Sequence, residues 1–177
     1  MLLARGCLKV RDTFLMRIRL SDEMIHNAMT ALPAGVSARP LRPPDDIPAL
    51  HAATEEAFAE HFNFEPTTLD DFALLVASEV EPERWLLAVD SGEVVGEVLA
   101  MCREHDIWIE SVSVRKPWRG RGLALALLQR QFAALHAEGH DDVFLGVDAQ
   151  NATGAVRLYE RAGMHVWRRF DVFQKMV

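Results

Sequence analysis

The sequence predicts one α/β domain of three layers, in which a mixed, mostly antiparallel sheet carries helices on both faces. Helical patterns come first, a run of strands with a tight turn follows, and the chain closes in a strand–helix–strand–helix–strand order. That closing order places at least one pair of strands parallel. The chain has 177 residues, 50% of them hydrophobic, which suits one compact domain with a sizeable core.

The N-terminal part of the chain reads as an extension to the main domain. From Leu15 to Arg19, apolar and basic residues alternate, which predicts a strand with one solvated face. A polar segment that contains a proline follows, from Ser21 to Gly35. We therefore place a boundary near Pro33, which gives an extension over residues 1–33 and a domain over residues 34–177.

A short strand and two helices open the main domain. The strand covers Val36–Leu41, and two prolines break it before Asp46, which is suited to cap a helix over Ile47–Glu60. The spacing of Thr68 and Asp71 is that of a capping box, with Asp in place of the usual Glu. It predicts a second helix that ends near Ser78.

Three strands follow these helices. Trp85–Val89 and Val94–Met101 are joined by a hairpin turn at Asp90–Gly92, and Ile107–Val114 forms the third strand. The alternation of side chains along a strand puts every second residue on the same face. In the third strand, this period of two predicts a common face for Trp108, Glu110, Val112 and Val114.

The C-terminal part alternates between helices and strands. A helix is expected over Leu123–Glu138, where Gly139 stops it, and the continuous apolar run Val143–Val147 predicts a central strand. A short helix over Ala155–Arg161 and a last strand over Val166–Met176 complete the domain.

Composition excludes several classes of function. The net charge of -7 argues against a wide nucleic-acid surface. No apolar run has the length needed to cross a membrane, and arginines and lysine interrupt the first 19 residues, unlike the core of a signal peptide. We expect a cytoplasmic protein. Cys7, Cys102 and the histidines show no metal-ligand spacing, so we expect no metal.

One segment has the features of an anion site. Gly120 and Gly122 lie between a strand and a long helix, where the lack of a Cβ lets backbone N–H groups approach a ligand. The N-terminus of a helix favours anions. Four basic residues cluster here in an acidic protein: Arg115, Lys116, Arg119 and Arg121. A polyphosphate ligand explains the cluster, although glycine-rich turns before helices are common and the pattern is neither a Walker A nor a dinucleotide motif.

The residues of this segment resemble a known family. Arg119-Gly-Arg-Gly-Leu-Ala124 resembles the Arg/Gln-x-x-Gly-x-Gly/Ala signature of the GNAT N-acetyltransferase superfamily, and the flanking strand Ile109–Val114 and helix start Leu123–Leu128 agree with it. Downstream, Val147–Gly163 resembles the family's Asn…Ala…Leu-Tyr-Glu…Gly block. The resemblance covers about Val36–Val177 and implies a GNAT-like sheet that is splayed open at the cofactor site.

The resemblance implies how coenzyme A or acetyl-CoA binds. The backbone amides that hold the pyrophosphate would be those of Arg119, Gly120, Arg121, Gly122, Leu123 and Ala124. The pantetheine arm would pair with the backbone of Val112 and Val114, and Asn151 would hydrogen-bond the same arm. A backbone N–H near Val112 would polarise the thioester carbonyl.

Two residues are candidates for proton transfer. By resemblance, Tyr159, the only tyrosine in the chain, would protonate the departing thiolate. Its alternative is a half-buried tyrosine that caps the core. Glu110 is the candidate general base, since some family members place a carboxylate on this strand; its alternative is a rim carboxylate in an ion pair. A water relay is a further solution within the family.

The acceptor is expected to be a primary amine. In the family the first two helices and their loop bind it, and this region offers Glu55, Glu56, Glu60, His61 and Glu65 beside Phe62 and Phe64. A solvated acidic face explains the same run. The segment most resembles tandem-domain acetyltransferases of the mycothiol-synthase type, but the chain has room for one complete domain, so that substrate is not assigned.

Three functions follow from this reading. They are a small-molecule N-acetyltransferase, a protein or peptide N-terminal acetyltransferase, and a non-catalytic acyl-CoA-binding module. Tyr159 and Asn151 favour activity over the third.

The extension shares a pattern with the C-terminus. Residues 6–20 and 163–177 each start at a glycine, carry an arginine at an equivalent place (Arg11 and Arg168) and end on an aliphatic residue. The extension is then either the last strand of a missing first domain or an unrelated arm. We expect it to dock on a sheet edge, of its own domain or of a second copy, and to support a homodimer. Its removal is expected to leave the cofactor site intact.

Overall fold

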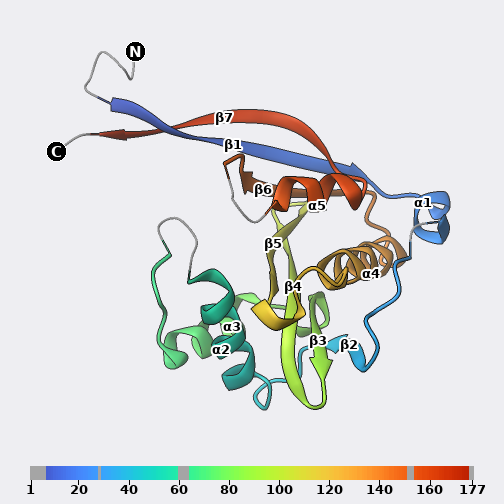
Figure 1. Cartoon of the computed structure of the whole chain (residues 1–177). Helices are drawn as coiled ribbons and strands as arrows, with labels where there is room; N and C mark the ends of the chain where they lie inside the picture. Colours follow the sequence, from blue (N-terminus) through green and yellow to red (C-terminus); the bar gives the residue numbers. More distant parts are fainter. Residues whose placement is uncertain (1–6, 28, 60–63, 151–153, 176–177) are drawn as a thin grey trace.

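The computed structural model describes residues 7–27, 29–59, 64–150 and 154–175 and contains one seven-stranded sheet, with helices on both faces (Figure 1). The strands are β1 (Cys7–Arg19), β2 (Val36–Pro40), β3 (Trp85–Asp90), β4 (Glu93–Arg103), β5 (Asp106–Val114), β6 (Asp142–Asp148) and β7 (His165–Lys175). The helices are α1 (Asp22–Asn27), α2 (Ile47–Phe58), α3 (Leu69–Glu79), α4 (Leu123–Ala137) and α5 (Ala155–Arg161), with 3-10 turns η2 (Pro82–Arg84) and η3 (Lys116–Trp118). The predicted three-layer, mixed sheet is confirmed.

The sheet has the strand order β2-β3-β4-β5-β6-β1-β7. Only β5 and β6 pair in parallel among the described strands, and every other neighbouring pair is antiparallel. The polar segment after β1 contains the short helix α1, which the sequence analysis did not predict.

Two apolar cores lie on opposite faces of the sheet. The larger one packs α4 against the central strands and includes Leu127, Leu128 and Phe132, each fully buried. The smaller one packs α2 and α3 against β3 and β4 around Leu50, which is also fully buried. From Val98 to Met101, consecutive residues of β4 alternate between the two cores, so this strand connects the layers.

The helix starts follow their expected caps in part. Thr68 caps α3: its Oγ1 accepts from the Asp71 backbone N–H at 3.2 Å and donates to the Asp71 carboxylate at 2.7 Å. Asp46 occupies the N-cap of α2, but its side chain makes no capping bond. It accepts instead from the Arg39 guanidinium at 2.6 and 2.7 Å and from the Arg42 backbone N–H.

The N-terminal strand lies inside the sheet. β1 pairs with β6 from Thr13 to Arg19 and with β7 from Cys7 to Arg17, so it has a neighbour on each side. The expectation that it docks on a sheet edge is wrong, because β1 is inserted between β6 and β7 and pairs with both. The two stretches of similar sequence thus pair with each other, and beyond the end of β6 they continue as a two-stranded ribbon (Figure 1). Its origin in a first domain, and a homodimer, stay predictions.

The side-chain alternation of β5 is interrupted at Glu110. Leu99 pairs with Ser111 and Ala100 with Ile109, which leaves Glu110 as an extra residue, a β-bulge. As a result Val112 and Val114 pack into the core under α4 together with residues 107 and 109. The predicted common face for Trp108, Glu110, Val112 and Val114 is therefore wrong, because the bulge reverses the alternation after residue 110.

Candidate functional site

The parallel strands β5 and β6 separate along their length. They pair at Ile107–Val143 and Trp108–Phe144, and beyond this point no strand of the described residues lies beside β5 on that side. The bulge at Glu110 lies where the separation begins. A bulge bends its strand and raises the local twist, which accounts for the divergence. The opened edge exposes the backbone of β5 to a cavity.

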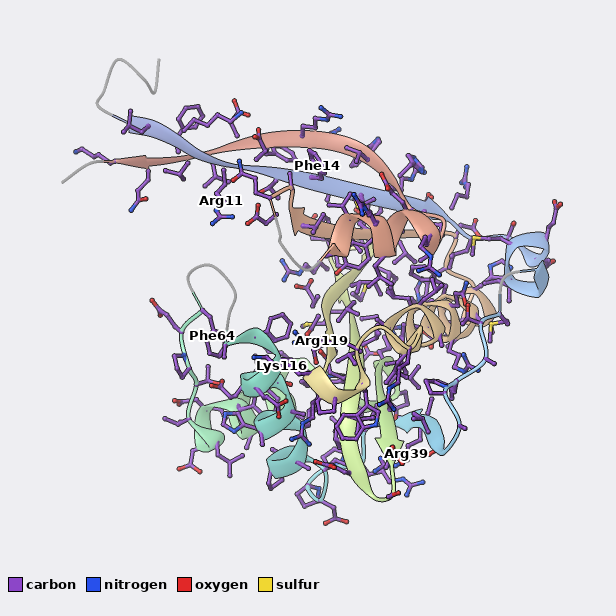
Figure 2. The ribbon with its side chains drawn as sticks, viewed as in Figure 1. Arg11, Phe14, Arg39, Phe64, Lys116 and Arg119 are labelled. Carbon is purple, nitrogen blue, oxygen red and sulfur yellow. The ribbon has the colours of Figure 1, made fainter. Side chains whose placement is uncertain are left out.

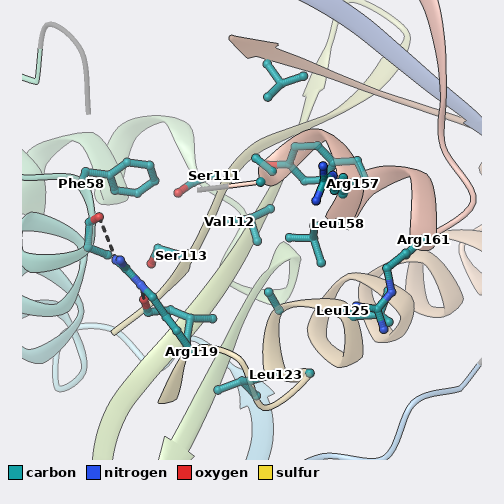
Figure 3. A pocket seen from close by; sticks show the side chains of 18 of the residues that line it. Phe58, Ser111, Val112, Ser113, Arg119, Leu123, Leu125, Arg157, Leu158 and Arg161 are labelled. Atoms are coloured by element: carbon teal, nitrogen blue, oxygen red, sulfur yellow. Dashed lines mark hydrogen bonds between the residues drawn. The ribbon is translucent and has the colours of Figure 1, made fainter. Parts of the chain in front are cut away.

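A cavity of about 590 Å³ fills this gap. It is lined by the second half of β5, the loop before α4, the first turn of α4, the end of β6, the last residues of α2 and one side of α5 (Figure 3). The predicted residues that line it are Glu110, Val112, Val114, Arg119, Gly120, Gly122, Leu123, Ala124 and Tyr159. Arg121 lies exposed in the same loop, and Asn151 lies outside the described residues.

The loop before α4 has the backbone that the glycines predict. Gly120 and Gly122 have φ angles of 74° and 79°, in the left-handed region that other residues rarely adopt. Gly122 is the N-cap of α4, so the backbone N–H groups that follow it point out of the helix without acceptors within it. With 15 residues, α4 is long enough for its N-terminus to favour an anion.

The side chain of Arg119 holds this loop in place. Its Nε donates to the backbone carbonyl of Val114 at 2.8 Å and its Nη2 to that of Ala57 at 3.2 Å. Arg119 thereby links the end of β5 to the end of α2 beside the cavity (Figures 2 and 3). The guanidinium of Arg119 is thus engaged within the protein, so only its backbone remains available to a ligand of the loop.

Two arginines that the sequence analysis did not select also line the cavity. Arg157 and Arg161 lie one turn apart on α5 and face the cavity that the glycine loop closes (Figure 3). Their i, i+4 spacing on a short helix next to the tyrosine was the signal in the sequence. Together with the α4 N-terminus they make this end of the cavity electropositive.

The side chain of Tyr159 places a phenol in the wall of the cavity. It extends from α5 and is half-buried against the core under α4. Burial raises the pKa of Tyr159 to about 12, and the charge of Glu97 contributes in the same direction. The phenol therefore keeps its proton throughout the neutral range, as a proton donor must.

Glu110 borders the cavity and is ion-paired. Its carboxylate lies 2.6 Å from Nε of Arg103, across the β4–β5 hairpin. This is the rim ion pair that the sequence analysis gave as the alternative to a general base. Its role as the base stays a prediction.

A second carboxyl group lies close to the cavity wall and was not selected from the sequence. Glu97 of β4 is fully buried. It accepts hydrogen bonds from Trp85 Nε1 at 2.9 Å and Ser111 Oγ at 2.7 Å, and its side chain also bonds Ser113. The signal in the sequence was one acidic residue in the otherwise apolar strand Val94–Met101.

The acidic side chains proposed for the acceptor already have partners. Glu55 accepts from the backbone and the hydroxyl of Thr67, and Glu56 pairs with Arg115 at 2.7 Å. Glu55 thus joins α2 to the segment before α3, and Glu56 joins α2 to the residue after β5, before any acceptor binds. Glu60, His61 and Phe62 lie outside the described residues.

The described ranges contain neither a candidate metal site nor a candidate membrane span. No three His, Cys, Asp or Glu side chains among them are grouped to hold a metal ion. No helix in the described part of the chain is long and apolar enough to cross a membrane.

Comparisons with known proteins agree with this architecture. The model of the acetyltransferase (GNAT) family matches residues 47–164. The mycothiol acetyltransferase of Arthrobacter sp. (strain FB24) is 33% identical over 174 residues, which cover 92% of this chain and 52% of that protein. The N-alpha-acetyltransferase MAK3 of Arabidopsis thaliana is 34% identical over 86 residues, 46% of this chain and 45% of that protein.

A solved structure is also similar. The crystal structure of a GCN5-related N-acetyltransferase from Sphaerobacter thermophilus has a TM-score of 0.83 and 41% identity, over 97% of this chain and 53% of that chain. The chain thus spans about half the length of this protein and of the mycothiol acetyltransferase.

Proposed function

Because the chain belongs to the GNAT acetyltransferase family, we propose that it transfers an acetyl group from acetyl-CoA to a primary amine of a small molecule. One observation carries the proposal. A glycine loop at a helix N-terminus, an unpaired strand edge and a protonated phenol line the same cavity of about 590 Å³. These are the parts that a pyrophosphate, an extended thioester arm and a leaving thiolate require.

The donor substrate fits the residues that are present. The backbone N–H groups from Arg119 to Ala124 would bind the pyrophosphate, and Arg157 and Arg161 would add positive charge. Val112 and Val114, which have no strand partner on the β6 side, offer their backbone to the pantetheine arm. Asn151 belongs to the same proposal by family resemblance, at a position outside the described residues.

Acyl transfer then needs three actions from the chain. A backbone N–H near Val112 stabilises the negative charge that develops on the thioester oxygen. The acceptor nitrogen attacks the carbonyl carbon after it has lost a proton. Tyr159 donates its proton to the sulfur as the carbon–sulfur bond breaks, which its pKa of about 12 allows at neutral pH.

A second candidate is a peptide N-terminal acetyltransferase. The match of 86 residues with the Arabidopsis enzyme favours it. The small-molecule proposal has wider support, because the mycothiol acetyltransferase matches 92% of the chain. Both candidates use the same donor site, so the acceptor has to be tested directly.

The test is thiol release from acetyl-CoA with panels of small amines, amino sugars and short peptides. The proposal expects amine-dependent release with a member of the first two panels. Release with peptides alone would support the second candidate. Binding of acetyl-CoA in calorimetry without release for any panel would point to a non-catalytic acyl-CoA-binding module.

A further inference from the structure

Glu97 is an acid in an unusual environment. Of the acidic side chains in the described ranges, it alone is fully buried. It lies in the middle of β4, where its Cα is paired with Leu87 on one side and Ser113 on the other. A buried carboxylate is costly unless other groups compensate its charge.

The groups that compensate Glu97 are neutral. The indole N–H of Trp85, a donor only, binds Oε2 at 2.9 Å, and the hydroxyl of Ser111 binds Oε1 at 2.7 Å. Ser113 contributes a further side-chain hydrogen bond. Glu97 therefore has donors for its anionic form, but within the described part of the chain it forms no ion pair, unlike Glu110, which pairs with Arg103.

Ser111 connects Glu97 to the cavity. The bulge at Glu110 turns Ser111 and Ser113 to the side of β5 that faces Phe58, opposite to Val112 (Figure 3). Ser111 lines the cavity and is partly exposed, whereas Ser113 is 6% exposed. The hydroxyl of Ser111 can thus contact a molecule in the cavity while it stays hydrogen-bonded to the buried carboxylate.

We propose that Ser111 and Glu97 form a proton relay that deprotonates the acceptor ammonium, an inference that rests on the acetyltransferase function proposed above. An N–H bond of the ammonium breaks and its proton passes to Oγ of Ser111. The proton already on that oxygen passes to Oε1 of Glu97. The products are a neutral amine, an unchanged serine and a protonated Glu97, so charge and atoms balance. Ser111 contacts the substrate, and Glu97 acts through it as the positioning residue.

The surroundings of Glu97 suit this role. Burial raises the pKa of Glu97, while the hydrogen bonds from Ser111, Trp85 and Ser113 limit that rise. A carboxylate with a raised pKa is a stronger base than an ordinary one. The proton on Glu97 later returns to solvent through Ser111. After it attacks the thioester, the nitrogen loses a second proton. This proton restores Tyr159, which has given its own proton to the sulfur.

The other reading is that Glu97 only holds β3, β4 and β5 together. The experiment therefore measures properties that a structural role does not change: the pH dependence of kcat/KM and the response to the protonation state of the acceptor. Wild type, Glu97→Gln, Ser111→Ala, Ser111→Thr and Glu110→Gln are assayed with acetyl-CoA and the best amine of the screen. Glu79→Gln, which removes a charge at the exposed end of α3, is the matched control.

The relay predicts a specific pattern. Glu97→Gln and Ser111→Ala each lower kcat by about 10²-fold or more and remove the acid limb of the kcat/KM profile, while acetyl-CoA affinity in calorimetry is kept. Ser111→Thr, which retains a hydroxyl, keeps most of the activity. With hydroxylamine as the acceptor, which is neutral at the assay pH, the fall in kcat of Glu97→Gln and Ser111→Ala is much smaller. The double variant Glu97→Gln/Ser111→Ala is no slower than either single variant, because the two residues act as one unit.

Other results overturn the relay. If Glu97→Gln and Ser111→Ala keep the wild-type rate and acid limb, Glu97 is structural. If Glu110→Gln alone removes that limb, the base is Glu110. If Glu97→Gln does not fold, the relay is tested by comparing the activity of Ser111→Ala with that of Ser111→Thr, since both variants keep the carboxyl group of Glu97. Absence of turnover in the wild type with every amine would instead refute the proposed function itself.

Discussion

Arg11 of β1 donates a hydrogen bond from Nη1 to Oδ2 of Asp148, 2.7 Å away, at the end of β6. Asp148 lines the cavity, and its Oδ1 also accepts from the backbone N–H of Gln150 at 2.8 Å. Arg11 and Phe14 both lie on β1, and Phe14 is paired with Val147 of β6 (Figure 2). The N-terminal strand therefore supports the wall of the site, although it is more than 100 residues away in sequence.

This support changes the expected effect of truncation. β1 pairs with β6 on one side and β7 on the other, so deletion of residues 1–20 removes the strand partner of β7 and exposes an edge of β6. We expect the truncated chain to lose cooperative melting and acetyl-CoA binding together, in contrast to the intact site that the sequence suggested. Circular dichroism and calorimetry on the same preparation would check both.

Arg11→Ala provides the milder form of this test. It keeps the strand and removes the bond to Asp148, an ion pair of partly exposed groups that is expected to contribute about 1 kcal/mol or less to stability. The acetyl-CoA affinity of Arg11→Ala should fall more than that of Arg19→Ala, which changes a side chain that is 70% exposed. Equal affinities for the two variants would show that Asp148 keeps its position without Arg11.

Gly122→Val is expected to abolish acetyl-CoA binding. Gly122 has a φ of 79°, and a β-branched side chain there strains the backbone by about 1–2 kcal/mol or more and covers the amides of the α4 N-terminus. Gly139→Val is the matched control, because Gly139 lies past the other end of α4 with a φ of 91° and is not among the cavity residues. Both should lower Tm, but calorimetry should find normal affinity only for Gly139→Val.

Replacement of both Arg157 and Arg161 by Ala is expected to weaken acetyl-CoA binding roughly tenfold. Charge-assisted hydrogen bonds to phosphate are stronger than neutral ones. At solvent-exposed sites, their contribution to binding affinity falls as ionic strength rises. The variant should therefore show a flatter dependence of Kd on salt than the wild type. Arg168→Ala, which removes an exposed arginine from β7, should retain the wild-type salt dependence.

Sequence periodicity predicted most elements of the fold because they are local. The apolar run of β4 and the apolar stripe of α4 mark their elements directly, and Gly122 marks the start of the helix. The position of β1 between β6 and β7 is a contact between distant segments and has no local signal. Likewise, one added residue at Glu110 leaves the composition of β5 unchanged yet reverses its faces, so the pairing of Ser111 with Glu97 could not be predicted.

Tyr159→Phe is expected to lower kcat by about 10²-fold or more with little change in acetyl-CoA affinity, because a proton donor acts mainly in the transition state. Since the pKa of Tyr159 is raised to about 12, loss of its proton should cause no alkaline decline of kcat in the neutral or mildly basic range. Stopped assays of thiol release across pH would measure both. A kcat within a few-fold of wild type would assign Tyr159 to packing alone.

The buried carboxyl of Glu97 should also make folding stability depend on pH. Because burial raises its pKa in the folded state, the folded protein binds a proton more tightly than the unfolded chain does. Its contribution to stability is fully present below the ordinary pKa of a glutamate and is lost as pH rises through the raised value. Glu97→Gln removes this titration, so the Tm of the variant relative to wild type should increase as pH rises over that range. Thermal melts in parallel with Glu79→Gln would check it, and a constant difference in Tm at all pH values would show that Glu97 has the same pKa in both states.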